Sequence, residues 1–442
     1  MLLLAAIAAA AAGWLLTRAS QEVRLATRSY YLITALNLAE AGVEEAMWAA
    51  NSAAFTSANG WTDAAGGGAV VYSRTTGLDV AQGSAEIHVR VDAPTSTNPV
   101  VTALGIVRLP GQRDLVKQLR VPIARRALWA NGMVAKGTII FTGNATVDAY
   151  DSNLGPWHAT TNRSDQATVA TLSTAPDPID LTSNASIYGY VATGGGAPDV
   201  GGSGRIYGPT TPANVKMDPL RMRGDFSANL PAVTTPTGTP ISLGNVTSTL
   251  TLPRAGDTPG PNGRYLYSAS SLSIAGNNSV SIKGPVDLIV TGNVSVSGNG
   301  NLSVGGTGST DPSLNLYAAG TVNIGGNGMI NHTSKPINST IYGTAPDGTT
   351  QSISISGNGS FVGTIYGPNA NLVLSGNGGN SGAVIAKTIN LSGNAEFHYD
   401  VRLAQVPSER YFRPTAWLEL TAPAGSGQGL ARDNREPFVG KL

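Results

Sequence analysis

The first fifty residues carry a continuous pattern of apolar and small positions that predicts one long helix. Residues 2 to 16 contain no charged side chain, the segment contains no proline, and Arg18 and Glu22 bring the first charges. At 1.5 Å per residue such a helix runs for about 75 Å. Helices of ordinary globular domains are much shorter. We therefore expect most of it to bury itself against something other than its own domain.

The two halves of this predicted helix differ in which faces are apolar. The first half is apolar all round and rich in alanine, which suits close helix packing better than plain lipid contact. In the second half, apolar residues recur at spacings of three, four and seven, and glutamates occupy other positions. These apolar positions are Leu25, Leu32, Leu36, Ala39, Val43 and Met47. We expect this second half to cover a sheet.

The apolar start also raises the question of targeting. Fifteen residues span about 22 Å as a helix, less than the ~30 Å hydrocarbon core of a bilayer. No lysine or arginine precedes Leu2, whereas a secretory signal peptide starts with basic residues. We expect a retained anchor or assembly helix, with a removed signal peptide as the alternative.

Residues 69 to 122 predict a small antiparallel sheet. Four strand-like runs are separated by turns that contain glycine, proline or aspartate. They cover residues 70–72, 85–91, 101–108 and 115–123. One face of such a sheet must be covered, and the amphipathic half of the helix is the expected cover.

From residue 127 onward, short β runs end repeatedly in Gly-Asn. The repeats lie at 143–144, 276–277, 292–293, 298–299, 357–358, 376–377 and 393–394. Glycine and asparagine tolerate left-handed corners, and stacked asparagines hydrogen-bond between layers. A period of about 17 to 20 residues with short strands favours a parallel β-helix with one coil per repeat. A β-sandwich with similar turns is the alternative.

Two segments depart from this repeat. Residues 206 to 262 contain nine prolines, a density that excludes regular central strands. We expect an ordered excursion on the flank of the β-helix, with a flexible linker as the alternative. Near the end, residues 411–414 and 417–420 would cap the open end of the β-helix. The final Pro437-Phe438-Val439 would reach a neighbouring subunit.

Composition narrows the class of protein. Charged residues make up 12% of the chain, and there are 55 glycines, which indicates turn-rich β structure. A net charge of +1 without a basic cluster argues against a nucleic-acid partner. The chain has no cysteine, which excludes a disulfide framework and thiol chemistry.

No catalytic or metal-binding constellation is apparent. The four histidines are scattered and form no zinc-binding spacing. Acidic residues between 271 and 400 form no pair at strand spacing, and no Walker motif or calcium loop is present. His398 closes the last repeat and is expected to be a hydrogen-bonded corner. We expect no enzymatic activity, no cofactor and no metal.

The stretch Leu38-Ala39-Glu40-Ala41-Gly42-Val43-Glu44-Glu45-Ala46, after an apolar start and a polar turn, resembles the N-terminal helix of type IV pilin-like proteins of the PilX class. The resemblance implies cleavage by a prepilin peptidase, a stage in the inner membrane, and assembly into a filament by pilus or type II secretion-like machinery. Two features depart from the family. Ala5 stands where a major pilin carries a glutamate, and no proline interrupts the helix near Glu22.

The resemblance continues in the C-terminal part of the chain. Residues 127–132, 150–152, 206–209, 218–220, 365–370 and 397–400 resemble the domain often fused to PilX-type N-termini. That domain has no clearly assigned chemistry. The resemblance therefore implies architecture and export route more than a ligand.

Together these patterns predict an α+β pilin-like N-terminal part, with a long helix and a small antiparallel sheet, followed by an all-β parallel β-helix domain. The expected boundaries are 1–53 for the helix, 54–124 for the sheet, 125–404 for the β-helix and 405–442 for cap and tail. We expect a structural subunit of an extracellular, cell-surface filament, with copies of itself as partners and the β-helix as the outer surface. The alternative is a minor pilin or tip adhesin that binds a glycan or surface.

Two groups of residues are candidates for function. The expected helix-packing residues are Leu2, Leu3, Leu4, Ile7, Trp14, Leu15, Leu16 and Leu25. Arg18 and Glu22 would set register between subunits, or form only a solvated surface pair. A glycan-binding strip would consist of Tyr188, Tyr190, Tyr207, Tyr342 and Tyr366. The alternative for these tyrosines is that they fill a flank or pack against the proline-rich excursion.

Overall fold

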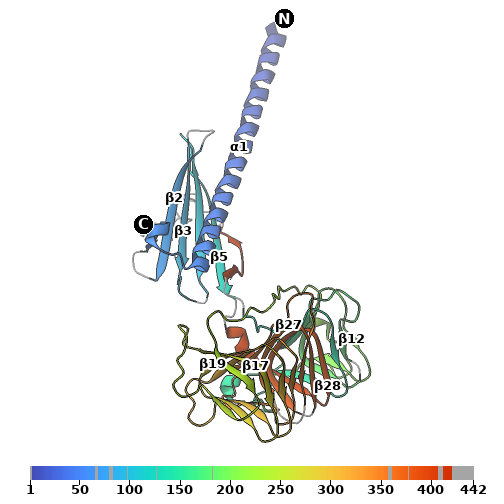
Figure 1. The fold of residues 1–442 in the computed structure, drawn as a ribbon. Coiled ribbons are helices and arrows are strands. Elements are labelled where there is room, and N and C mark those ends of the chain that lie inside the picture. The colour runs from blue at the N-terminus through green and yellow to red at the C-terminus, as the bar shows by residue number, and fades with distance from the viewer. Residues whose placement is uncertain are drawn as a thin grey trace. The chain divides into compact units, whose positions relative to one another are not determined.

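The computed structural model describes the backbone of residues 2–64, 68–78, 83–96, 98–125, 127–181, 183–356, 361–376, 378–406 and 412–420. Side chains are described for the same residues except 2–10, 77–78 and 125. The chain forms two compact units, which we describe separately (Figure 1). Unit one comprises Met1–Arg126 and Pro407–Leu442, and unit two comprises Ala127–Val406.

Unit one opens with a long helix, α1 (Leu2–Ser52). Its sequence is rich in alanine and leucine and contains no proline, so no residue interrupts the ladder of backbone hydrogen bonds. The helix ends where Ala53 adopts a left-handed conformation with φ of 52°. The amide of Ala54 then donates to the carbonyl of Ala49 at 2.8 Å, which satisfies one of the last helical carbonyls.

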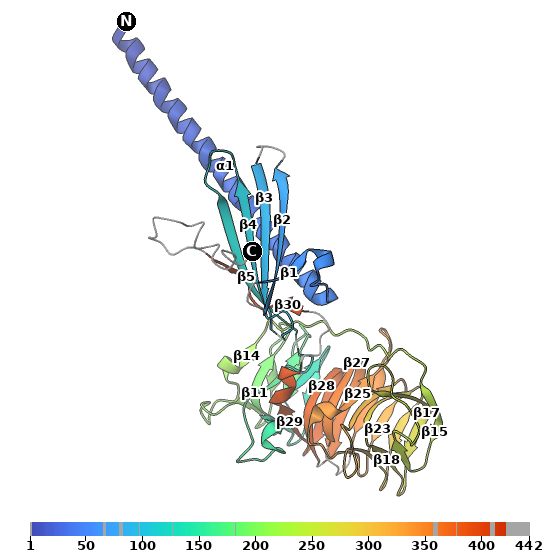
Figure 2. The ribbon, with the colours of Figure 1, turned by 90° about the vertical axis from the view of Figure 1, so that its left-hand side faces the viewer.

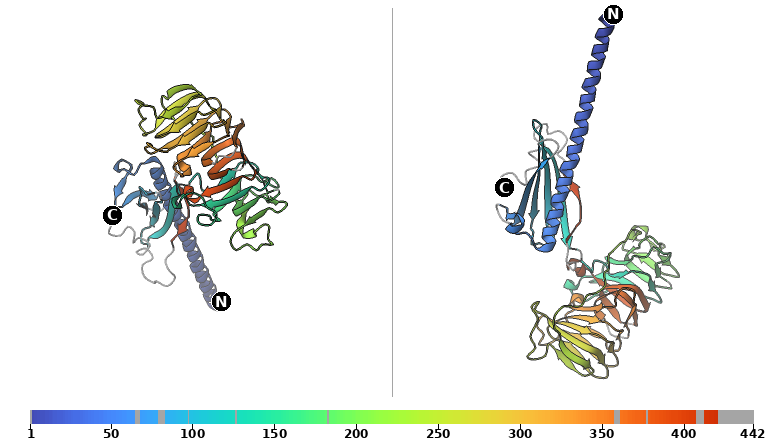
Figure 3. Two further views of the ribbon diagram at one scale, coloured as in Figure 1. Left: turned by 90° about the horizontal axis from the view of Figure 1, so that it is seen from below. Right: turned by 45° about the horizontal axis from the view of Figure 1, so that its top comes forward.

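Only the second half of α1 packs on the sheet of unit one (Figure 3). Its buried residues recur at spacings of three and four, as expected for one face of a helix. They are Tyr31, Ala35, Ala39, Gly42, Val43, Ala46, Ala49 and Ala50. Leu36 and Met47 are partly buried against the same core, as the sequence pattern indicated. Most of these side chains are small, so the helix approaches the sheet closely.

The sheet of unit one is antiparallel and follows the chain in the order β1-β2-β3-β4-β5. Its strands are β1 (Trp61–Asp63), β2 (Ala69–Leu78), β3 (Gly83–Asp92), β4 (Val100–Arg108) and β5 (Leu115–Arg125). A short 3-10 turn, η1 (Ser57–Asn59), connects α1 to β1. The small antiparallel sheet expected from the alternating pattern is therefore present.

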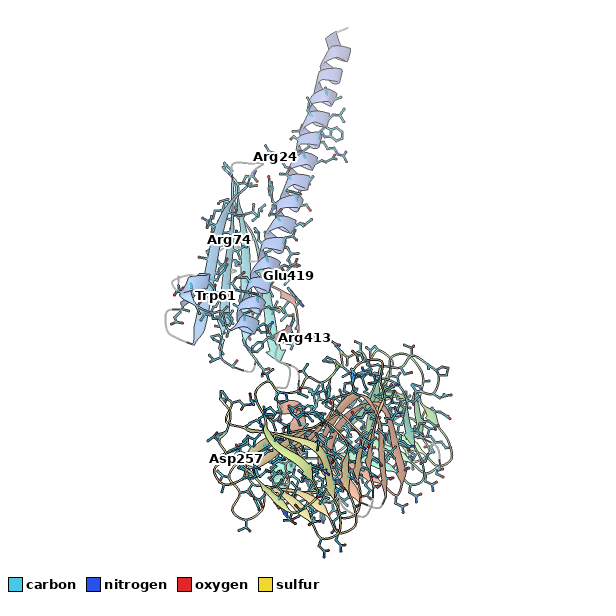
Figure 4. All side chains as sticks on the ribbon, in the orientation of Figure 1. Arg24, Trp61, Arg74, Asp257, Arg413 and Glu419 are labelled. Atoms are coloured by element: carbon cyan, nitrogen blue, oxygen red, sulfur yellow. The ribbon has the colours of Figure 1, made fainter. Side chains whose placement is uncertain are left out.

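Two short C-terminal strands extend this sheet. Both β30 (Phe412–Pro414) and β31 (Leu418–Glu419) pair antiparallel with β5. Glu419, which is labelled in Figure 4, forms an ion pair with Lys117 of β5. These residues lie on the edge of the antiparallel sheet instead of capping the C-terminal β domain, so the predicted cap is wrong. Pro437-Phe438-Val439 lies outside the described residues.

Unit two is built from short parallel strands, which fall into two sets along the chain. The first set comprises β6 (Met133–Ala135), β7 (Ile139–Phe141), β8 (Thr146–Tyr150), β9 (Ala167–Thr171), β10 (Ile179–Leu181), β11 (Ser186–Ala192), β12 (Asp199–Val200), β13 (Arg205–Tyr207) and β14 (Met222–Arg223). Short 3-10 turns η2 (Ser152–Leu154) and η3 (Pro219–Arg221) lie between them.

The second set follows residues 224–240, which contain no regular element. Its strands are β15 (Ile241–Val246), β16 (Leu250–Leu252), β17 (Tyr265–Ile274), β18 (Ser279–Ile282), β19 (Pro285–Val290), β20 (Val294–Val296), β21 (Asn301–Val304), β22 (Ser313–Ala318), β23 (Val322–Ile324), β24 (Met329–Asn331), β25 (Ser339–Gly343), β26 (Gln351–Ile355), β27 (Phe361–Gly376), β28 (Gly379–Gly393) and β29 (Glu396–Asp400). The 3-10 turns η4 (Pro336–Asn338) and η5 (Val401–Gln405) complete the unit.

The strands of unit two do not pair in chain order. The last strands β28 and β29 pair parallel with the first strands β6, β7 and β8. Figure 2 shows β28 and β29 lying between β11 and β25. Parallel pairs also form a closed circuit, which runs from β28 through β6, β9, β11, β8 and β29 back to β28.

The predicted fold class is therefore wrong. One N-terminal helix is followed by almost entirely β structure, and the C-terminal part is a closed, barrel-like domain of parallel strands. The sequence pattern predicted that each Gly-Asn repeat forms one coil of a β-helix and that this coil stacks on the preceding one. Pairing of the first strands with the last strands closes the sheet instead, and this pairing joins residues about 250 positions apart.

One apolar row shows how the core of unit two is built. Eight buried residues occupy successive positions in neighbouring parallel strands. In pairing order they are Leu272, Val294, Val322, Ile353, Leu372, Ile389, Ile139 and Ile179, each no more than 1% exposed. Alternate residues of each strand point inward, so short I-x-I and V-x-V runs suffice to fill this core.

Asparagines at the corners bond between layers, as the repeat predicted. Asn144 donates to Asn394 at 2.9 Å, and Asn184 donates to Asn144 at 3.0 Å. Gly143 and Gly393, which precede two of them, have φ of 74° and 81°, a conformation that disfavours residues with a Cβ.

The proline-rich segment is ordered against unit two. Leu230 is 8% exposed and belongs to the core cluster of that unit. The carbonyl of Pro231 accepts a 2.7 Å hydrogen bond from the hydroxyl of Tyr366. β15 and β16 also fall within residues 206–262, and within the described residues each has one paired strand, β17 and β18 respectively. The segment therefore contains strands at the ends of sheets. Proline is tolerated there because the outer edge of an end strand forms no ladder of hydrogen bonds with another strand.

Candidate functional site

The first half of α1 projects from unit one without covering anything in that unit. Every described side chain from residue 11 to residue 30 is exposed. Among the predicted packing residues, Trp14 is 60% exposed, Leu15 59%, Leu16 73% and Leu25 67%. Large apolar side chains normally avoid this degree of exposure when several lie together. The side chains of Leu2, Leu3, Leu4 and Ile7 lie outside the described residues.

The exposed apolar surface is longer than the sequence analysis proposed. Val23, Tyr30 and Ile33 are also 57% or more exposed. Leu25 was expected on the sheet-covering face, but the first buried position among the described side chains of α1 is Tyr31. The apolar periodicity gave no indication of where the sheet begins along the helix, because that depends on the length of β2 to β5. Within the described residues, no helix is both long and apolar enough to cross a membrane.

Arg18 and Glu22 form an exposed ion pair one helical turn apart. Nε of Arg18 lies 3.7 Å from a carboxylate oxygen of Glu22, and the two side chains are 62% and 71% exposed. The Arg18 guanidinium also lies 5.3 Å from the ring centre of Trp14. An exposed pair of this kind stabilises an isolated helix only weakly. Its role in register between subunits stays a prediction.

The predicted tyrosines fall into two separate clusters. Tyr342 stacks on Tyr317 with 4.8 Å between ring centres, and Tyr366 lies 6.4 Å from Tyr342. Tyr366 is 5% exposed, contacts Trp129 edge-on and is bonded to Pro231. Burial raises the pKa of all three of these tyrosines. This cluster fits the alternative of packing against the proline-rich segment.

The second cluster combines tyrosines with arginines. Tyr188 lies 5.1 Å from Tyr207, and Arg163 and Arg205 lie 4.5 Å and 4.7 Å from the respective ring centres. Tyr190 is 41% exposed. The guanidinium groups are occupied by the protein itself: Arg163 bonds Asp148 at 2.7 Å, and Arg205 donates to backbone carbonyls. Cation-π contacts of this kind stabilise the outer face of β11 and β13.

His398 belongs to a buried polar cluster, as expected for a structural corner. It is 3% exposed, its Nδ1 lies 2.6 Å from Asp148, and Trp157 stacks on its ring with 3.9 Å between centres. Asp148 also accepts from Arg163. Sequence reasoning missed Asp148 and Trp157, because both precede His398 by more than 240 residues. Within the described residues, no group of three or more His, Asp or Glu side chains is placed to hold a metal ion.

Residues 242–406 match the model of a domain of unknown function (DUF7305). No curated protein matches the chain. Among solved structures, the chain is similar to the competence-associated pilin ComZ from Thermus thermophilus, at 11% identity and a TM-score of 0.27, over 80% of this chain and 88% of ComZ.

Proposed function

We propose that this chain is a pilin-like structural subunit that assembles into an extracellular filament through the first half of α1. The observation that carries the proposal is the division of α1 into two parts. Residues 31–50 bury one face on the sheet of unit one, whereas residues 11–30 expose Trp14, Leu15, Leu16 and Leu25. A continuous apolar helix that leaves its own unit is suited to packing against copies of itself.

The energetics favour burial of this surface. Fully burying a large apolar side chain stabilises an assembly by about 1.5–3 kcal/mol. Several such side chains, repeated in every subunit, exceed the entropic cost of association when one helix contacts several neighbours. Alanines at 11 and 12 would let helices approach closely. Unit two would then form the outer surface of the filament.

The resemblance to the PilX class supplies the rest of the proposal. It suggests processing by a prepilin peptidase, an inner-membrane stage, and assembly by pilus or type II secretion-like machinery. The polar cluster around His398 has the contacts of a structural corner, which supports a non-enzymatic role. No cofactor enters the proposed function.

Substitution in the exposed half of α1 tests assembly. We expect Leu15→Asp combined with Leu16→Asp to abolish filaments, because each subunit would then bury two carboxylates among apolar helices. Leu220→Asp is the matched control, since Leu220 is 80% exposed on unit two, and it should leave filaments intact. Circular dichroism should show the same folded content for both variants. Filaments of normal yield from the Leu15/Leu16 variant would contradict the proposal.

A minor pilin or tip adhesin is the second candidate. The observation that favours it is Ala5, which stands where a major pilin carries a glutamate. Labelling of the chain along sheared filaments distinguishes the two roles. Label at regular intervals along the shaft supports the main subunit, and label confined to filament ends supports the tip role.

A further inference from the structure

Unit two contains a cavity that is open to the surface and has two lysines in its lining. Its volume is about 440 Å³, within the range of small-molecule sites. The lining residues are Lys136, Gly137, Gly348, Thr349, Asn369, Lys387 and Thr388. We call this the lysine cavity. None of these residues belongs to the tyrosine clusters or to α1.

A change of register between β27 and β28 builds one side of the lysine cavity. Gly367 pairs with Ala386, and the next pair is Asn371 with Thr388. Residues 368–370 of β27 therefore oppose Lys387 alone, and the extra backbone bulges at this corner. The loop after β6 closes the other side, where the amide of Gly137 donates to the carbonyl of Lys387 at 2.8 Å.

Asn369 organises the polar groups of the cavity. It is 6% exposed, and its Oδ1 accepts from the Lys136 ammonium at 3.0 Å. Its Nδ2 donates to the carbonyl of Ala345 at 2.9 Å and to Asp347 at 3.0 Å. Its carbonyl oxygen and both of its amide hydrogens are thus engaged, so Lys136 is positioned by a buried side chain.

Positive charge exceeds negative charge around the cavity. Lys136 lies 3.8 Å from Asp347, whose side chain is 77% exposed. Lys387 donates to the hydroxyl of Thr350 at 2.8 Å and forms no ion pair within the part of the chain that the structure describes. An ammonium has three donors, so both lysines keep donors for a ligand. The other polar groups of the lining are hydroxyls and an amide.

We infer that the lysine cavity binds a carboxylate-bearing sugar unit of an acidic polysaccharide. Lys387 and Lys136 engage the carboxylate as point charges. The hydroxyls of Thr349 and Thr388 donate to the carbonyl of Pro346 and to Oδ1 of Asn371, so they accept hydrogen bonds from the sugar hydroxyls. Gly137 and Gly348 leave room for the ring. The inference concerns unit two only and does not depend on filament assembly, so each can fail without the other.

The geometry gives Asp347 a role opposite to that of the lysines. Its carboxylate forms an ion pair with the ammonium of Lys136 in the ligand-free protein and would repel the carboxylate of an incoming ligand. Removing that charge with Asp347→Asn should therefore tighten binding, while removing either ammonium should weaken it. If these residues had a purely structural role, the Asp347 and lysine substitutions would not change the binding affinity in opposite directions.

Calorimetric titration of the full chain with a galacturonate trimer tests the inference. We expect saturable binding that weakens with added salt. Lys387→Gln and Lys136→Gln should each raise Kd about tenfold, the loss of one charge-assisted hydrogen bond. Asp347→Asn should lower Kd. Lys283→Gln is the matched control, because Lys283 donates to the carbonyls of Gly305 and Thr307, away from the lysine cavity, and it should leave Kd unchanged.

Three results would overturn the inference. The first is equal binding of a neutral galactose trimer, or no binding of either trimer. The second is an unchanged Kd for Lys387→Gln whose melting temperature matches that of the parent. The third is binding of inorganic sulfate as tightly as the galacturonate trimer, which would make the cavity a simple anion site.

Discussion

Gly105 of β4 lies directly against the backbone of α1 at Ala35. A Cβ placed on Gly105 would overlap the carbonyl oxygen of Ala35, and it would lie 2.8 Å from the amide nitrogen of Ala39 and 2.9 Å from Cβ of Leu38. Backbone atoms of a helix cannot move aside as a flexible side chain can. The absence of a side chain at Gly105 therefore allows α1 to rest closely on its sheet.

Gly105→Ala is therefore expected to destabilise unit one. Overpacking costs about 1–3 kcal/mol when the surroundings shift, although Gly to Ala is otherwise favourable in regular structure. The midpoint of denaturant unfolding measures the loss. Gly13→Ala in α1 is the control, since no atom lies within 4 Å of a Cβ there. If Gly105→Ala and Gly13→Ala were equally stable, the close packing of Gly105 against the backbone of α1 would be refuted.

Asn51, near the end of α1, holds β30 through two hydrogen bonds. Its Oδ1 accepts from the amide of Phe412 at 2.6 Å, and its Nδ2 donates to the carbonyl of Phe412 at 3.3 Å. We expect Asn51→Ala to destabilise unit one by about 1–2 kcal/mol, because the Phe412 backbone loses these two hydrogen bonds. Faster proteolysis after residue 412 would report release of β30. The Asn37→Ala variant changes an exposed position of the same helix and should be cleaved at the same rate as the parent protein.

Arg264 compensates the buried carboxylate of Asp287. Its Nε lies 2.6 Å from Asp287, whose side chain is 6% exposed, and it also donates to Ser313 at 2.8 Å. We expect Arg264→Met to destabilise unit two by about 3–5 kcal/mol, since the buried charge loses its partner. Thermal melting measures the loss. Arg264→Met with Asp287→Leu removes both charges and should recover much of the stability, and failure to recover would assign the loss to packing.

The tyrosine cluster of Tyr317, Tyr342 and Tyr366 predicts loss of stability at alkaline pH. Burial raises the pKa of each hydroxyl above its ordinary value of 10.0. The unfolded chain therefore loses these protons first, so their stabilising effect is complete below pH ~10 and declines as pH rises above it. Denaturant midpoints at rising pH measure the decline. The stability of Tyr342→Phe should decline less steeply with pH than that of the parent protein. An identical pH dependence of the two proteins would contradict the role of burial.

The sequence by itself determined the local elements. An uninterrupted, proline-free run specified α1 to within a few residues, since helix formation depends on contacts four residues apart. Alternation specified β2 to β5, because successive side chains of a strand face opposite sides. Gly-Asn repeats also marked corners such as Gly143-Asn144, where a left-handed conformation is required. Each of these properties depends on neighbours along the chain.

Only the tertiary structure decided what those elements pair with. Nothing local to Met133 indicates that β6 pairs with β28, or that Phe412 adds a strand to β5. The burial of Tyr366 beneath Pro231, and the meeting of Lys136 with Asn369, likewise join residues more than 130 positions apart. Parallel strands need no adjacency in sequence and share one repeating pattern, so many pairings satisfy the same local preferences. The shape and burial of the complete core select among them.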